Sequence, residues 1–295
     1  MMNPNVYRLT KSMLMCSSFG VGPLTRRIMK HYHTAPAPLV GTMKHNPNIQ
    51  DEPEPFSIIN PDLIVGYDLN YSWMNRKTYS CHILGSGMIV LKNYISLLGQ
   101  VGMVNLCDKL GSGPGGFYMP RNQDGHTLRL HMMCFGRNWD PVTGYNNQCR
   151  IDGSEPPPLS YGFVHLAKIA IEDAQAHMHE LSLMCPDTCI VNFFRCGDRL
   201  GIHQDCDESS DSLERGLPVL SIFIGDDAEF WYGHIRDENK YRKVVLESGD
   251  VLIYGGTSRL IYHGVKIIIP GSAPVSLLEA TKLMPGCLSL TLKQY

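Results

Sequence analysis

The sequence lacks a long apolar run, a Cys-x-x-Cys pair and any large excess of charge. No segment approaches the roughly 18 consecutive apolar residues that a membrane-spanning helix requires, so we expect no membrane partner. Ten cysteines are present, but the sequence has neither a secretory signal nor the composition of a small disulfide scaffold, and reduced thiols are expected. Cys185 and Cys189 lie four positions apart, and no second pair completes a zinc site.

The net charge of −2 provides no general attraction to phosphate, so a nucleic-acid surface would have to be a local basic patch. Residues 1–50 are the exception, because they contain several Lys and Arg but no Asp or Glu. This composition is typical of a transit peptide to a mitochondrion or plastid. The alternative is a disordered basic arm on a protein of the cytoplasm or nucleus. Residues 34–61 are rich in proline and predict a linker.

The chain is long enough for one large domain, which we expect over residues 81–295, after an extension and linker over residues 1–80. Apolar residues near helical period predict a helix within residues 90–110 and a second helix around Phe163, Leu166, Ile169 and Ala170. Short apolar runs between turn residues predict strands at residues 189–194, 219–224, 229–232, 243–246, 251–254, 265–269 and 288–292. Helices followed by short strands indicate an α+β fold.

The most informative pattern is the triplet His203-Gln204-Asp205 with a lone histidine, His263, further along the chain. Two imidazoles and one carboxylate can occupy one face of an iron(II) ion and leave the opposite face open for a chelating co-substrate and dioxygen. In an extended strand, residues i and i+2 point to the same side, so His203 and Asp205 can reach one ion together. A His-x-Asp triplet is frequent by chance, so the surrounding sequence has to decide.

That context consists of several motifs in a fixed order. They are Gly113-Pro114-Gly115-Gly116-Phe117, Asn138-Trp139-Asp140-Pro141, Asn192, residues 201–208, residues 246–259, His263 and Ser289-Leu290-Thr291-Leu292-Lys293-Gln294. In this order they resemble the AlkB family of iron(II)- and 2-oxoglutarate-dependent nucleic-acid demethylases, and they are most similar to the AlkB homologues of plants. The resemblance extends from about residue 84 to residue 295.

The resemblance implies a double-stranded β-helix, or jelly-roll, core that uses Fe(II), 2-oxoglutarate as co-substrate, and dioxygen. By position it implies His203, Asp205 and His263 as the metal ligands. It also implies that the co-substrate is bound at four further positions, which are Asn192, Phe194, Ser289 and Lys293.

The last predicted strand departs from the family pattern Arg-x-Asn-x-Thr-x-Arg. Here the corresponding residues are Cys287, Ser289, Thr291 and Lys293, which strict alternation keeps on one face. Only Lys293 keeps a positive charge, and Phe194 stands where a co-substrate-binding tyrosine is common in the family. Truncating one partner of a buried, hydrogen-bonded charge pair typically costs about 2–5 kcal/mol. The sequence therefore predicts metal binding with a weakened hold on the co-substrate.

The resemblance implies three substrate contacts. Trp139 and Tyr145 lie in the segment that looks like a nucleotide-recognition lid, and Asp207 aligns with a family position near the target base. Such enzymes act on a single-stranded or flipped-out base that stacks on aromatic side chains. The alternative is that the two aromatic residues only pin a long loop to the domain, and that Asp207 and Glu208 are solvated loop charges.

The leading hypothesis is oxidative demethylation of N-methylated bases in DNA or RNA, for example N6-methyladenine or 1-methyladenine. The nucleic acid is then the expected partner, and no obligate protein partner is indicated. One alternative is a catalytically impaired paralogue that uses the same scaffold to bind nucleic acid or a protein, because the last strand has lost the family arginines. Another keeps the chemistry but acts on a protein side chain, a choice that the fold alone does not decide.

Overall fold

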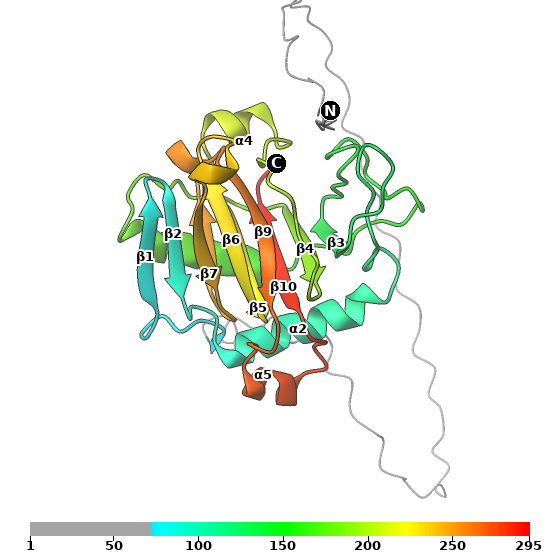
Figure 1. The fold of residues 1–295 in the computed structure, drawn as a ribbon, viewed down its shortest axis with the longest axis horizontal. Coiled ribbons are helices and arrows are strands. Elements are labelled where there is room, and N and C mark those ends of the chain that lie inside the picture. The colour runs from blue at the N-terminus through cyan, green and yellow to red at the C-terminus, as the bar shows by residue number, and fades with distance from the viewer. Residues whose placement is uncertain (1–71) are drawn as a thin grey trace, which may run out of the picture. The chain divides into compact units, whose positions relative to one another are not determined.

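The computed structural model describes residues 72–295, which contain two antiparallel sheets and four α-helices (Figure 1). The larger sheet has seven strands in the order β1-β2-β8-β5-β10-β4-β3, and the smaller sheet has three in the order β7-β6-β9. Their bounds are β1 Ser80–Gly85, β2 Met88–Lys92, β3 His131–Gly136, β4 Thr188–Phe194, β5 Val219–Gly225, β6 Asp227–Gly233, β7 Arg242–Leu246, β8 Val251–Tyr254, β9 Tyr262–Ile269 and β10 Cys287–Lys293. These two sheets form the predicted jelly-roll core of an α+β fold.

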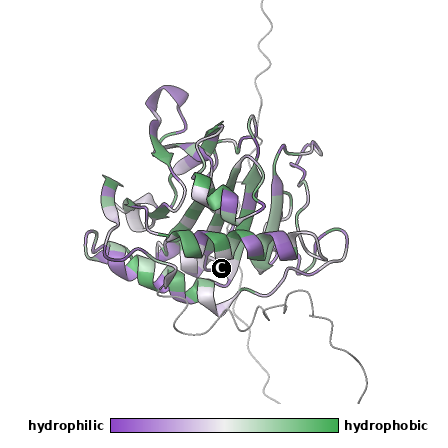
Figure 2. Ribbon diagram, turned by 90° about the horizontal axis from the view of Figure 1, so that it is seen from below, coloured by the Kyte–Doolittle hydropathy of each residue, from purple (hydrophilic) through white to green (hydrophobic). Residues whose placement is uncertain are grey.

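The α-helices are α2 Leu97–Gly111, α3 Tyr161–Gln175, α4 Ser210–Glu214 and α5 Val275–Ala280, with two short 3-10 helices at Glu238–Lys240 and Gly256–Ser258. Figure 1 shows α2 lying across the larger sheet, and Figure 2 shows the helices with the strands behind them. None of the helices within residues 72–295 is both long and apolar enough to cross a bilayer.

Two apolar clusters lie on opposite faces of the larger sheet. The outer cluster joins α2 and α3 to strand residues such as Val191, Ile222 and Leu290. The inner cluster lies between the sheets and includes Phe194, Phe223 and Phe230. Strands β4 and β5 are buried along their whole length, because apolar layers cover both of their faces. Successive residues of these strands therefore alternate between the outer cluster, where they pack against the helices, and the inner cluster between the two sheets.

The helix predicted within residues 90–110 begins later than expected, and its first part is strand β2. The chain turns at Asn93, which has a positive φ of 54°, and Ser96 then caps α2 by accepting a hydrogen bond from the amide of Gly99. Gly99 is needed there, since a Cβ at this position would lie 2.6 Å from the carbonyl oxygen of Trp73. Gly99 thus allows the start of α2 to pack closely against Trp73.

The second predicted helix is confirmed as α3, with Phe163, Leu166, Ile169 and Ala170 buried. All seven predicted strands are present, and β9 begins three residues earlier than predicted, at Tyr262. Strands β1, β2 and β3 were not predicted. All nine cysteines in the part of the chain that the structure describes are free thiols, as expected.

The predicted transit peptide and the proline-rich linker at residues 34–61 lie outside the described residues. Trp73 and Met74 already pack in the outer apolar cluster. The folded region therefore extends upstream of residue 81, where the sequence predicted it to begin.

Candidate metal centre

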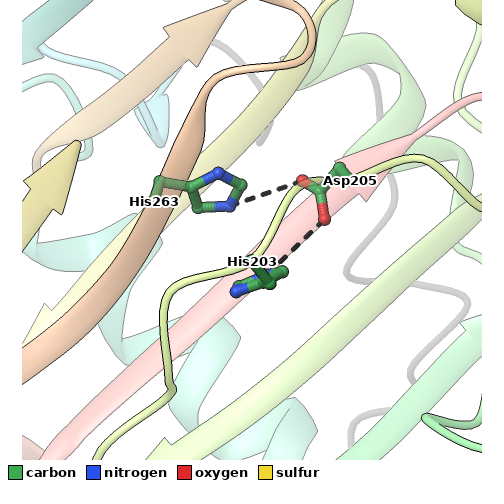
Figure 3. A group of neighbouring side chains, drawn as sticks. All are labelled: His203, Asp205 and His263. Carbon is green, nitrogen blue, oxygen red and sulfur yellow. Dashed lines mark ion pairs between the residues drawn. The ribbon is translucent and has the colours of Figure 1, made fainter. Parts of the chain in front are cut away.

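Three side chains predicted as metal ligands converge at one end of the space between the two sheets. The ligand atoms of His203, Asp205 and His263 all lie within 4.8 Å of one another. The Nε2 atom of each histidine is 3.7 Å from a carboxylate oxygen of Asp205 (Figure 3). Two imidazole nitrogens and one carboxylate oxygen, directed at one point, form a donor set suited to a divalent first-row transition metal.

The backbone fixes both histidines. His203 and His263 form an isolated antiparallel bridge in which each amide donates to the other's carbonyl oxygen at 2.9 Å. The Nδ1 atom of His203 lies 2.8 Å from the carbonyl oxygen of Gly201, and that of His263 lies 3.0 Å from the carbonyl oxygen of Ile261. These contacts assign the proton to Nδ1 in each ring, so both Nε2 lone pairs face Asp205.

The segment that carries His203 and Asp205 is irregular and not an extended strand, because His203 alone makes a bridge there. The two side chains nevertheless reach the same point. The segment approaches β9 closely at Gly264, where a Cβ would lie 2.6 Å from the carbonyl oxygen of Leu200. A glycine at position 264 is therefore required for the bridge to form.

Asp205 is buried, and neighbouring groups engage both of its carboxylate oxygens. The Nζ atom of Lys293 is 2.7 Å from Oδ1, and the Tyr254 hydroxyl donates a short hydrogen bond to Oδ2. Burial alone would raise the pKa of Asp205, but Lys293 and the two histidines outweigh it and hold that pKa well below its usual range. Burial and Asp205 both raise the pKa of Tyr254 well above its ordinary value, so its hydroxyl remains a donor.

Behind Asp205 lies a buried chain of charges that the sequence did not reveal. Glu208 pairs with Arg259 at 2.8 Å and with Lys293 at 3.0 Å, and its own side chain is fully buried. Arg259 also donates to the backbone carbonyl of Asp205 at 2.6 Å. The alternative that made Glu208 a solvated loop charge was wrong. Tyr254, Glu208 and Arg259 were not predicted as site residues, because no pattern in a single sequence indicates that they meet.

A cavity of about 270 Å³ opens beside the three ligands. Asn192, Phe194, Ser289 and Lys293, the predicted co-substrate residues, all line it, as do Ser221 and Thr291. Much of the remaining wall is apolar and includes Ile190, Leu200, Phe223, Phe230 and Val265. The alternation predicted for the last strand is confirmed, since Leu288, Leu290 and Leu292 face the outer cluster instead.

Only one of the three predicted substrate residues, Trp139, lines the cavity. Its indole Nε1 donates to Asp207 at 3.0 Å, and the Tyr145 hydroxyl donates to Glu208 at 3.4 Å. Tyr145 also packs against Tyr295, with ring centroids 5.0 Å apart. Hydrogen bonds of Tyr145 and Asp207 thus connect the predicted lid segment, residues 138–147, to the loop that follows Asp205.

The side chains of the site include a complete donor set for a metal ion, but only some of the groups that would bind a 2-oxo acid. The Asn192 amide and the Ser289 hydroxyl face the cavity, and within the described residues neither has a side-chain hydrogen-bond partner. Lys293 is the one Lys or Arg among the cavity-lining residues in residues 72–295, and it already pairs with Asp205 and Glu208. Arg195 does not replace the family arginines that the last strand lacks, because it lines a different cavity on the other side of the sheet.

Comparison with known proteins gives a consistent result. A family model described as the 2OG-Fe(II) oxygenase superfamily matches residues 87–292. An Arabidopsis thaliana protein named DNA N(6)-methyladenine demethylase ALKBH1C is 46% identical over 230 residues, which cover 74% of this chain and 50% of that protein. The AlkB dioxygenase of Salmonella typhimurium is 30% identical over 206 residues, covering 65% of this chain and 86% of that protein.

Among solved structures, that of OsALKBH1 is similar at 44% identity with a TM-score of 0.70, covering 73% of this chain and 100% of that one. The chain spans between 50% and 59% of the length of the Arabidopsis relatives that it matches.

Proposed function

Because this chain belongs to the AlkB family within the 2OG-Fe(II) oxygenase superfamily, we propose that it removes N-methyl groups from nucleic-acid bases by oxidation. The observation that carries the proposal is the convergence of His203, Asp205 and His263 at the end of a cavity that Trp139 also lines. When bound, Fe(II) with 2-oxoglutarate and dioxygen supplies the oxidising chemistry that converts an N-methyl group to a hydroxymethyl group, which leaves as formaldehyde.

The residues of the chain have separate roles in this proposal. His203, Asp205 and His263 would hold the metal, with Lys293 and Tyr254 fixing the orientation of Asp205. The apolar cavity wall excludes water from the reacting groups. Trp139 offers a flat surface on which an unpaired base can stack, and its hydrogen bond to Asp207 holds the indole in place.

The names of the relatives support the choice of substrate class. Two Arabidopsis relatives are named DNA N(6)-methyladenine demethylases, and a Schizosaccharomyces pombe relative is named a tRNA demethylase. We therefore propose a single-stranded or flipped-out methylated base as substrate, with N6-methyladenine in DNA as the first to test and 1-methyladenine as the second.

The test measures formaldehyde and succinate together, using Fe(II)-loaded protein and oligonucleotides that carry N6-methyladenine or 1-methyladenine. We expect both products in equal amounts, and we expect the variant His203→Ala to release neither. The exposed histidine variant His177→Ala is the matched control and keeps the native rate. Native protein that binds the metal but forms neither product would contradict the proposal.

The second candidate function is that of an impaired paralogue that binds nucleic acid without turnover. It is favoured by Lys293, whose ammonium is already paired with two carboxylates and is not free for the co-substrate. Its signature would be oligonucleotide binding by the native chain without succinate, and succinate release by the triple variant Cys287→Arg, Ser289→Asn, Lys293→Arg.

A further inference from the structure

The wall of the cavity that leads away from the metal ligands carries uncharged polar groups in place of a cation. Thr291 and Ser289 follow Lys293 along β10 at every second residue, so they face the same cavity at increasing distance from Asp205. Ser221 of β5 is the register partner of Thr291, and Asn192 of β4 is the partner of Ser289. The four side chains form one continuous polar row.

The hydrogen-bonding capacity of this row is limited and neutral. The Ser221 and Thr291 hydroxyls are 3.0 Å apart and bonded to each other, so the pair has one proton left for a ligand. The Ser289 hydroxyl and the Asn192 amide have no side-chain partner among the described residues and are free to donate. A ligand group at this row meets neutral donors only.

The nearest cation does not change this balance. Lys293 is 4% exposed, and its Nζ atom lies 2.7 Å from Asp205 and 3.0 Å from Glu208. The charge of Glu208 is shared in turn with Arg259, which is buried and directed at the backbone of Asp205. Drawing Lys293 toward a ligand carboxylate would break its buried ion pair with Glu208 and leave that carboxylate with Arg259 alone, which is costly.

We propose that this cavity recognises the far end of its 2-oxo acid through neutral donors, and so distinguishes little between a 2-oxo dicarboxylic acid and a 2-oxo monocarboxylic acid of equal length. Ser221, Ser289, Thr291 and Asn192 are the residues that set this specificity. The inference rests on the proposed function, because it assumes that the keto acid end of the ligand chelates a metal held by His203, Asp205 and His263.

The physical reason is the cost of burying a second negative charge. A carboxylate that leaves water for an apolar cavity loses hydration, and hydrogen bonds from neutral groups return only part of that loss. A buried ion pair with a cation typically accounts for a factor of about 30 to several thousand in affinity. Without that pair, the second carboxylate of 2-oxoglutarate confers little net advantage over a methyl group that packs against Phe194 and Phe223.

The experiment uses the full chain loaded with Co(II) under anaerobic conditions, so that binding is measured without turnover. The visible absorption of Co(II) reports metal binding, and its change reports chelation by an added 2-oxo acid. The two acids are 2-oxoglutarate and 2-oxopentanoate, which has the same chain length but ends in a methyl group. We expect dissociation constants within about tenfold of each other, below the factor that a buried ion pair provides.

Two variants test whether the row is responsible. Ser289→Lys introduces a cation that has no acidic neighbour in the row, and we expect it to favour 2-oxoglutarate over 2-oxopentanoate by at least about 30-fold. Ser289→Met, of similar length and uncharged, is the matched control and should not create that preference. Cys287→Arg, which adds a cation at the next inward-facing position of β10, gives a second test if Ser289→Lys does not fold.

Similar affinities in the native chain, with a preference for 2-oxoglutarate gained by Ser289→Lys or Cys287→Arg, support the inference. A native preference of more than about 100-fold for 2-oxoglutarate would overturn it and leave the proposed function intact, because a cation must then reach the far carboxylate. Binding of Co(II) without any spectral response to either acid would overturn both.

Discussion

Asp205 is the most closely constrained of the three ligands. Lys293 and Tyr254 take one carboxylate oxygen each, so the carboxylate cannot rotate without losing a buried hydrogen bond. The Tyr254 hydroxyl oxygen also lies 3.1 Å from Nε2 of His263, so this phenol adjoins both ligands. Partners of this kind set the orientation and basicity of metal ligands. Tyr254 and Lys293, which lie on strands far along the chain from Asp205, thus fix the orientation of its carboxylate.

Glu208 provides a residue-scale prediction. Its fully buried carboxylate compensates both Arg259 and Lys293, so Glu208→Gln leaves two buried cations with too little negative charge. We expect the free energy of unfolding to fall by about 3–5 kcal/mol, measured by urea denaturation of the metal-free protein. Glu172→Gln is the matched control, because Glu172 pairs with Lys168 at the surface, where such pairs contribute about 0–1 kcal/mol. Equal losses in the two variants would refute the assignment.

At the scale of elements, the sequence predicted strands well where an apolar run was bounded by turn residues, as in β8 between Gly249 and Gly255. The sequence failed to predict β2, since Leu91, Ile95 and Leu98 have helical spacing although the chain turns at Asn93, between the strand and the helix. Local spacing cannot reveal that turn, because the position of β2 is fixed by pairing with the distant strand β8.

The convergence of His203, Asp205 and His263 could be predicted from sequence because their types and order match a metal-binding donor set. The shared side expected for His203 and Asp205 depended on an extended backbone, but the segment that carries them is irregular and joined to β9 by a single bridge. Tyr145 and Asp207, which were predicted to contact the substrate, do not line the cavity and form hydrogen bonds with Glu208 and Trp139, respectively. A tyrosine and an aspartate are suited both to contacting a substrate and to holding a loop in place, and only the packing of residues 138–147 shows the contacts that they make.

The approach of this segment to β9 leads to a prediction for Gly264→Ala. The added methyl group would lie 2.6 Å from the Leu200 carbonyl oxygen and 2.9 Å from that of Gly201, and both are backbone atoms that cannot move alone. We expect the segment to shift and Co(II) affinity to fall by about 10- to 100-fold, measured by titration calorimetry. Gly201→Ala is the control, because a Cβ there meets nothing within 4 Å. Native affinity in Gly264→Ala would show that the bridge is dispensable.

At the scale of the whole molecule, the two sheets bury a group of charges, and stability should therefore depend on pH. Burial, together with His203 and against the opposing effect of Asp205, lowers the pKa of His263 from 6.5 to about 4. In the metal-free protein, the unfolded chain binds a proton at His263 between these pH values and the folded chain does not. The free energy of unfolding therefore decreases as pH falls through this window.

From pH 7 to pH 4 the loss due to His263 amounts to at most about 3 kcal/mol, measured by urea denaturation at several pH values. His263→Gln should flatten the pH dependence between pH 6.5 and 4, while the exposed-residue variant His177→Gln should not. Asp205 acts in a lower window, because its lowered pKa adds a further loss only as pH falls below about 4. Parallel curves for the native chain and His263→Gln would contradict the assignment.

The polar row of β10 and the bridged histidines belong to different parts of the chain, and this separation bears on how such proteins diverge. The histidine ligands are oriented by carbonyl groups of residues 201 and 261, which do not depend on side-chain identity. The co-substrate wall consists of side chains on β4, β5 and β10, and each can be exchanged singly. A change in one of these wall residues can therefore weaken binding of the 2-oxo acid while the backbone contacts that orient the histidines stay intact, so the His-x-Asp and His signature indicates a metal site more reliably than it indicates activity.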